Sequence, residues 1–186
     1  QCHGPVPGEI AQLVGVIVTV PVSEKIGKKA TFLSVLTIIS VLSVIVMFLP
    51  DTPAGMWTLM VLQVLICIAI GINSPLLWTM FADVADYSEL KNGNASTGLI
   101  FSSSSMAQKF GAAFGSAIVL WVLMAFGYDN AKGAVQTPEA LSTIKALISW
   151  IPAIGSAAGI LIMSMYPLTE KKMSEIREKL KVVRGE

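Results

Sequence analysis

The chain carries little charge. Lys, Arg, Asp and Glu make up 13% of its 186 residues, whereas charged residues make up about 25% of a soluble globular domain. Ten of the charged residues lie in the last seventeen positions, from Glu170 to Glu186. The remainder of the chain is therefore too apolar for a soluble domain.

The side chains on which several functional classes depend are also scarce. Two cysteines and one histidine are too few for a disulfide framework, a zinc site or histidine-based catalysis. A net charge of +1 offers no basic surface to nucleic acid. We expect no metal site, no cofactor and no nucleic-acid partner, and no set of catalytic groups indicates an enzyme.

What the chain does contain is long uncharged runs. A helix needs about 20 apolar residues to cross hydrocarbon about 30 Å thick, and its backbone polar groups must be satisfied within the helix. The run from Asn92 to Tyr128 is broken only by Lys109, and three others carry no charge: 30–50, 52–82 and 146–169. The sequence therefore predicts an all-α membrane protein.

Gly, Pro, Asn and Asp residues between the runs mark the expected helix ends. We predict five transmembrane helices, at about 9–22, 30–49, 56–82, 97–127 and 141–166. The first is truncated, because the apolar stretch 10–22 would rise only about 20 Å. We interpret the chain as the C-terminal piece of a longer protein, with a partial transmembrane bundle at 1–169 and a tail at 170–186.

The distribution of Lys and Arg predicts the orientation. The 23–29 loop has three of these residues and the tail after Thr169 has six, and such loops favour the cytoplasm. We expect a multi-pass protein of the plasma membrane with a cytoplasmic C-terminus. Apolar residues recur at helical spacing in the tail and predict an amphipathic helix, on the membrane surface or against the bundle, although a solvated stop signal fits equally: Met173, Ile176, Leu180 and Val183.

Lys109 is the most informative residue, because it lies near the middle of an apolar helix. A lone cation there costs about 2.5–3.5 kcal/mol on insertion scales. Ser102 and Ser105 precede it, and Ala112 and Ser116 follow it, on one narrow face. This pattern favours a water-filled transport path, and the alternative is a structural pair with a buried acid on another helix.

Small residues on the last two helices predict close helix–helix packing. The two motifs are Gly111-x-x-x-Gly115 and Gly155-x-x-x-Gly159. In the third helix, Pro75 follows Asn73 and Ser74, and proline removes a backbone hydrogen bond. Such a break builds binding sites and hinges in carriers, but it also occurs as plain architecture.

Two further features of the third helix offer alternatives. Trp78 is suited to stack on a sugar ring or to anchor the helix at the membrane interface. The charged cluster that follows favours a cytoplasmic network that latches helix ends over acid–base catalysis, and it comprises Asp83, Asp86, Tyr87, Glu89 and Lys91.

These residues together resemble the glycoside–pentoside–hexuronide:cation symporters, the melibiose-permease-like branch of the major facilitator superfamily. The resemblance rests on the run Asp83-x-x-Asp86-Tyr87-x-Glu89-x-Lys91, on Lys109-Phe110-Gly111-Ala112-Ala113-Phe114-Gly115, and on Gly27-Lys28-Lys29. Two positions depart from the family. Ser74 stands where melibiose permease has an aromatic residue, and Ala95 stands where members commonly have an arginine.

The resemblance implies helices eight to twelve of a twelve-helix carrier. The position matching Lys109 lies near the sugar and cation sites in that family, and the positions matching Ser105 and Gln108 lie at the sugar. The expected partners are a sugar, a coupling cation (Na⁺ or H⁺), the lipid bilayer and the N-terminal helices of the same carrier.

We therefore hypothesise a sugar:cation symporter that works by alternating access. Lys109 would couple to the cation, sugar contacts would come from Lys109, Ser105, Gln108, Ser74 and Trp78, and the 83–91 cluster would form a cytoplasmic gate. The alternatives are another facilitator, such as a proton-coupled drug antiporter, and a membrane protein that does not transport.

Overall fold

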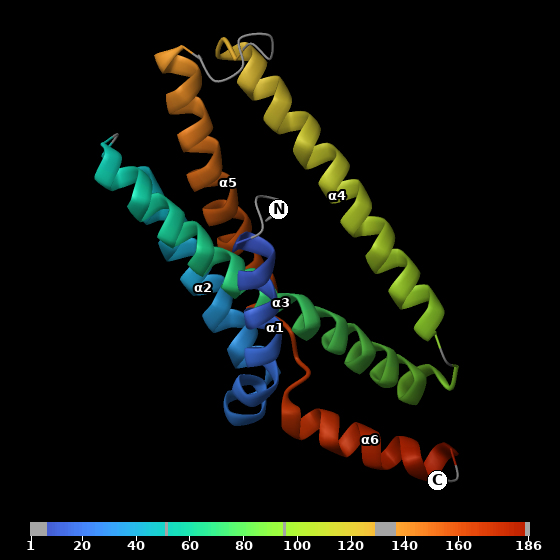
Figure 1. The fold of residues 1–186 in the computed structure, drawn as a ribbon. Coiled ribbons are helices and arrows are strands. Elements are labelled where there is room, and N and C mark those ends of the chain that lie inside the picture. The colour runs from blue at the N-terminus through green and yellow to red at the C-terminus, as the bar shows by residue number, and fades with distance from the viewer. Residues whose placement is uncertain (1–6, 51, 95, 129–136, 185–186) are drawn as a thin grey trace.

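The protein is all-helical in the residues that its computed structural model describes, which are 7–50, 52–94, 96–128 and 137–184. Figure 1 shows a bundle of helices side by side, with the helix at 97–125 running apart from it and the helix at 170–184 lying across one end. The six helices are α1 (Pro7–Ile26), α2 (Lys28–Met47), α3 (Pro53–Asn92), α4 (Thr97–Ala125), α5 (Pro138–Ser164) and α6 (Glu170–Arg184).

Four helices, α2 to α5, are long and apolar enough to cross a membrane. The first helix is longer than predicted, because α1 extends over 20 residues instead of the expected 9–22, which corresponds to about 30 Å. Its added residues include the charged Glu24 and Lys25. The structure thus supports a multi-pass bundle, and a fifth crossing by α1 stays a prediction.

The third helix was predicted to end at residue 82, and this prediction was wrong. α3 continues for ten more residues and ends at Gly93, whose positive φ of 70° permits the left-handed turn that closes it. No glycine or proline interrupts the chain between Asp83 and Asn92, so nothing stops the helix where its charge begins. The acids of the 83–91 cluster therefore lie on a helix and not on a loop.

α1 and α3 approach each other closely. A Cβ atom built on Gly15 would lie 2.2 Å from the carbonyl oxygen of Ile68, and one on Gly71 would lie 2.2 Å from that of Gln12. The Thr19 hydroxyl donates to Ile72 O across the same crossing, at 3.3 Å. Two glycines thus let the backbones of α1 and α3 touch, as small residues do between membrane helices.

The two predicted glycine motifs behave differently from this crossing. A Cβ on Gly111, Gly115 or Gly155 would meet nothing within 4 Å, and one on Gly159 would lie 3.1 Å from Leu36 Cδ1. The motif on α4 therefore makes no close approach to any helix that the structure describes. The physical reason is that α4 stands away from the bundle and has no buried residue.

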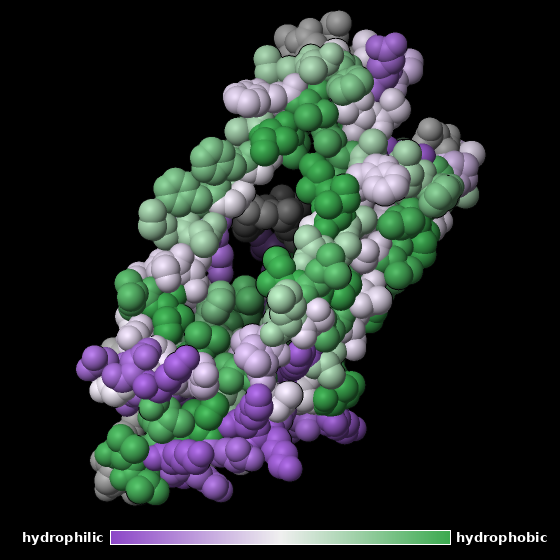
Figure 2. All heavy atoms as spheres, turned by 180° about the vertical axis from the view of Figure 1, so that it is seen from behind, coloured by the Kyte–Doolittle hydropathy of each residue, from purple (hydrophilic) through white to green (hydrophobic). Residues whose placement is uncertain are grey.

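Polar and apolar side chains separate along the molecule. Hydrophilic residues gather over the end that carries α6, and hydrophobic residues cover much of the rest (Figure 2). The same view shows an opening between α4 and the neighbouring helices. We refer to the end with α6 as the charged end.

The α1–α3 crossing generates a prediction with an internal control. Gly71→Ala places a methyl group against the Gln12 carbonyl, so we expect it to lower the free energy of unfolding by about 1–3 kcal/mol. Gly111→Ala meets open space and should have the opposite sign, because alanine favours helices over glycine by about 0.8–1.0 kcal/mol. Thermal unfolding followed by circular dichroism in detergent measures both, and equal effects would contradict the crossing.

Candidate functional site

The residues predicted to bind substrate lie on two helices, α3 and α4. On α4, Gln108 and Lys109 are exposed and Ser105 is half-buried. On α3, Ser74 is exposed beside Asn73, and the buried Oδ1 atom of Asn73 has no hydrogen-bond partner among the described residues. These groups offer a cation, hydroxyls and amides without apolar cover.

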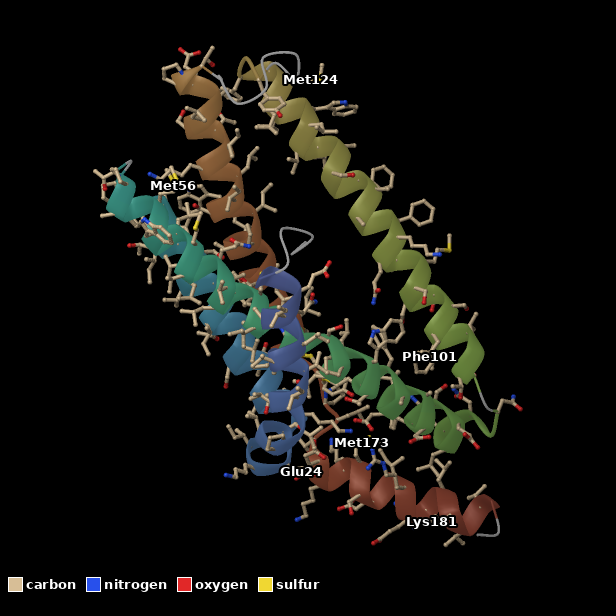
Figure 3. The ribbon with its side chains drawn as sticks, viewed as in Figure 1. Glu24, Met56, Phe101, Met124, Met173 and Lys181 are labelled. Atoms are coloured by element: carbon tan, nitrogen blue, oxygen red, sulfur yellow. The ribbon has the colours of Figure 1, made fainter. Side chains whose placement is uncertain are left out.

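Trp78 joins these two helices. Its ring stacks on Phe101 of α4, with centroids 5.8 Å apart and an interplanar angle of 10°, and it meets Phe81 edge-on. Figure 3 shows Phe101 between the start of α4 and the second half of α3. One face of the indole is therefore covered by protein, and 38% of the residue stays exposed. Phe101 was not singled out from the sequence.

Lys109 is exposed on a helix that has no buried residue. Neither the Lys28–Asp83 pair nor the Arg177–Asp83 pair involves Lys109. A cation in hydrocarbon needs a partner or water, and this bundle leaves the α4 face bare. The α4 face is defined by Ser105, Gln108 and Lys109. Because it carries a cation and polar groups, this face requires a polar environment.

A second polar site lies at the charged end and centres on Asp83. The Asp83 side chain is only 5% exposed, and each of its oxygens meets a cation. Lys28 Nζ lies 2.6 Å from Oδ2, and Arg177 Nη2 lies 2.7 Å from Oδ1. A buried carboxylate requires such compensation, because the loss of its hydration costs several kcal/mol. We call these three residues the Asp83 clamp.

The segments around the Asp83 clamp are tied by further polar contacts. The backbone N–H of Lys28 donates to Glu170 Oε1 at 3.0 Å. Lys29 Nζ donates to the carbonyl oxygens of Ser164 and Tyr166, at 3.0 and 2.6 Å. The turn between α1 and α2 is thereby fastened to the end of α5 and the start of α6.

The tail helix docks on the bundle, which is one of the alternatives predicted for it. Met173, Ile176 and Leu180 are buried with Leu168 and pack against Val84 and Leu90 of α3. Figure 3 shows Met173 on the side of α6 that faces α3 and Lys181 on the outer side. The predicted stripe is one residue shorter, because Val183 is 74% exposed.

The five residues of the predicted gate lie along the last part of α3 and differ in exposure. Asp83 is buried in the clamp, whereas Tyr87 and Lys91 are exposed and meet each other, with Lys91 Nζ 6.0 Å from the ring centroid. Asp86 and Glu89 are half-buried on the same helix. The residues that the sequence missed are Lys28 and Arg177. The position of Arg177, beside the apolar stripe of the tail, was the available signal.

Tyr166 completes the charged end with a buried hydroxyl. Its Oη atom is buried and has no hydrogen-bond partner among the described residues. Burial, together with the negative charges of Asp83 and Glu170, raises the pKa of Tyr166 to about 12. Both effects disfavour the phenolate.

The Asp83 clamp generates a prediction on stability. Asp83→Asn leaves Lys28 and Arg177 without their counter-charge, so we expect the free energy of unfolding to fall by about 3 kcal/mol. Glu178→Gln removes a carboxylate from the exposed side of α6 and should change it by less than about 0.5 kcal/mol. Thermal unfolding in detergent compares the two, and a similar effect of both changes would contradict a buried clamp.

Tyr166 generates a prediction on pH. Because its folded-state pKa of about 12 exceeds the ordinary value of 10.0, the unfolded chain releases this proton first, and stability falls as the pH rises from 10 toward 12. Tyr166→Phe should remove the tyrosinate absorbance step near pH 12 and leave stability at neutral pH unchanged or higher. Loss of a step near pH 10 instead would contradict the buried site.

A family model described as "MFS/sugar transport protein" matches residues 5–170. The putative glycoside/cation symporter YagG of Escherichia coli (strain K12) is 28% identical over 173 residues, which cover 93% of this chain and 37% of that protein. No solved structure gave a significant match.

The names of two further relatives include a sugar. The glucuronide carrier protein homolog of Escherichia coli (strain K12) is 31% identical, over 90% of this chain and 36% of its own length. The isoprimeverose transporter of Lactiplantibacillus pentosus is 27% identical, over 92% of this chain and 36% of its own length. The chain thus spans little more than a third of these relatives.

The family match and these relatives confirm the resemblance to sugar:cation symporters. They agree with four helices that are long and apolar enough to cross a membrane. The chain therefore belongs to the MFS/sugar transport protein family.

Proposed function

We propose that this chain forms the C-terminal portion of a carrier that symports a sugar with Na⁺ or H⁺ by alternating access. The sugar is a glycoside, a pentoside or a hexuronide. The observation that carries the proposal is the bare α4 face with Lys109 near its middle, in a chain whose relatives are named as sugar and cation transporters.

The partner of the α4 face is the remainder of the carrier. Relatives are about two and a half times as long as this chain, and carriers of this kind bind substrate at mid-membrane between two halves. The missing helices would cover the α4 face and close a watered cavity around Lys109. The gap between α4 and its neighbours (Figure 2) is consistent with a surface made for that contact.

Each residue near this cavity has a role that its chemistry supports. Lys109 couples to the cation, because its charge repels the ion and attracts any acid that the ion neutralises. Ser105, Gln108 and Ser74 donate and accept hydrogen bonds with sugar hydroxyls. The exposed edge of Trp78 contacts the apolar face of the sugar ring, with Phe101 fixing the orientation of the indole.

The charged end is the cytoplasmic end in this proposal. It carries the lysines of the α1–α2 turn and the cations of α6, in keeping with the positive-inside rule. The C-terminus is then cytoplasmic, α1 is a fifth crossing helix, and the 83–91 segment belongs to a cytoplasmic gate. Asp83 holds this gate through its two cations.

Lys109 provides the test. Lys109→Gln in the complete carrier should abolish uphill sugar uptake, because coupling needs the positive charge, while Lys25→Gln removes an exposed cation from α1 and should leave uptake near wild type. Uptake of a panel of labelled glycosides is measured under Na⁺ and H⁺ gradients. Undiminished accumulation by the Lys109 variant would overturn the role of Lys109, and drug export without sugar uptake would indicate a different facilitator.

A further inference from the structure

The two cations of the Asp83 clamp are held unequally. The Lys28 side chain is 22% exposed, whereas that of Arg177 is 51% exposed. Water competes with an ion pair in proportion to its access, so the exposed partner is the easier one to release. If Arg177 leaves, Lys28 still compensates the buried carboxylate.

Lys28 and Arg177 also belong to helices that differ in how firmly they are attached to the bundle. Lys28 begins α2, which packs along the bundle through the buried residues Val35 and Ile39. Arg177 belongs to α6, a helix of 15 residues that follows a linker at 165–169. A helix of this length is marginal in water by itself. Undocking of α6 from α3 is therefore coupled to loss of its helical structure.

The apolar stripe and the clamp fix α6 at the same place. Met173 and Ile176 precede and flank Arg177, Leu180 follows it, and all three pack into the cluster with Val84 and Leu90. Val84 is the neighbour of Asp83 in α3. Release of Arg177 thus removes the ion pair at the centre of the docked surface, where α6 joins the charged end of α3.

We propose that α6 is a releasable strap, in which Arg177 latches the tail to Asp83 and restrains the charged end of the bundle. Opening of the latch lets this end move while Lys28 keeps Asp83 paired. Regulation of transport by the strap rests on the proposed function. The release of α6 is a property of these contacts and can be measured without transport.

Hydrogen exchange of the protein in lipid nanodiscs tests the strap. Arg177→Gln should raise amide exchange across 170–184 by about tenfold or more, as expected for loss of a hydrogen bond between charged groups. Exchange at 84–92 should rise less, and exchange at 53–60, at the other end of α3, should stay unchanged. Arg177→Lys should restore part of the protection.

Lys179→Gln is the matched control, because it removes one cation from an exposed position of the same helix. It should change exchange by less than about twofold. High salt should raise exchange of α6 in the wild type and in the control, but not further in Arg177→Gln, since screening acts on the latch.

Two results would overturn the proposal. Equal exchange of α6 in Arg177→Gln and Lys179→Gln would mean that the ion pair does not hold the tail. A uniform rise through all helices would mean that Arg177 supports the whole fold and does not act as a latch. Either result leaves the Lys109 test of sugar transport untouched, so the two proposals fail separately.

Discussion

A carboxylate removed from water must be compensated, and this requirement organises the charged end of the protein. Asp83 is buried on α3, and its compensation comes from the start of α2 and from the tail helix. Because each oxygen has its own cation, three segments far apart in the sequence are brought to one point. The contacts of Lys29 with the linker after α5 and the docking of Met173 depend on the same arrangement.

Away from this point the helices are held by packing of two kinds. Lipid tails are as apolar as the helices, so association requires close fit and polar contacts. Gly15 and Gly71 bring α1 and α3 into backbone contact. α4 is joined to α3 by the stacking of Trp78 on Phe101 and has no buried residue. The bundle therefore combines one tightly packed pair of helices, α1 and α3, with one helix, α4, that has no buried residue.

The approximate positions of the apolar helices α2 to α5 could be predicted, because long uncharged runs have few alternatives in a membrane. The extension of α3 could not be predicted from charge, since the acids from Asp83 onward change the polarity of the helix without ending it. The Gly15–Gly71 crossing and the Arg177–Asp83 pair depend on which helices become neighbours. A single sequence shows which residue types lie on one face of a helix, but not which other helix packs against that face.

The continuity of α3 has a consequence for the evolution of this protein. Ser74 lies near the middle of the helix and Asp83 lies in the clamp. The two residues are nine positions apart in one continuous helix. One inserted or deleted residue between them would rotate all that follows by about 100° and turn Asp83 away from its cations. Loops tolerate changes of length, whereas the spacing between Ser74 and Asp83 within the helix does not. Lineages that carry the clamp should therefore vary here by substitution alone.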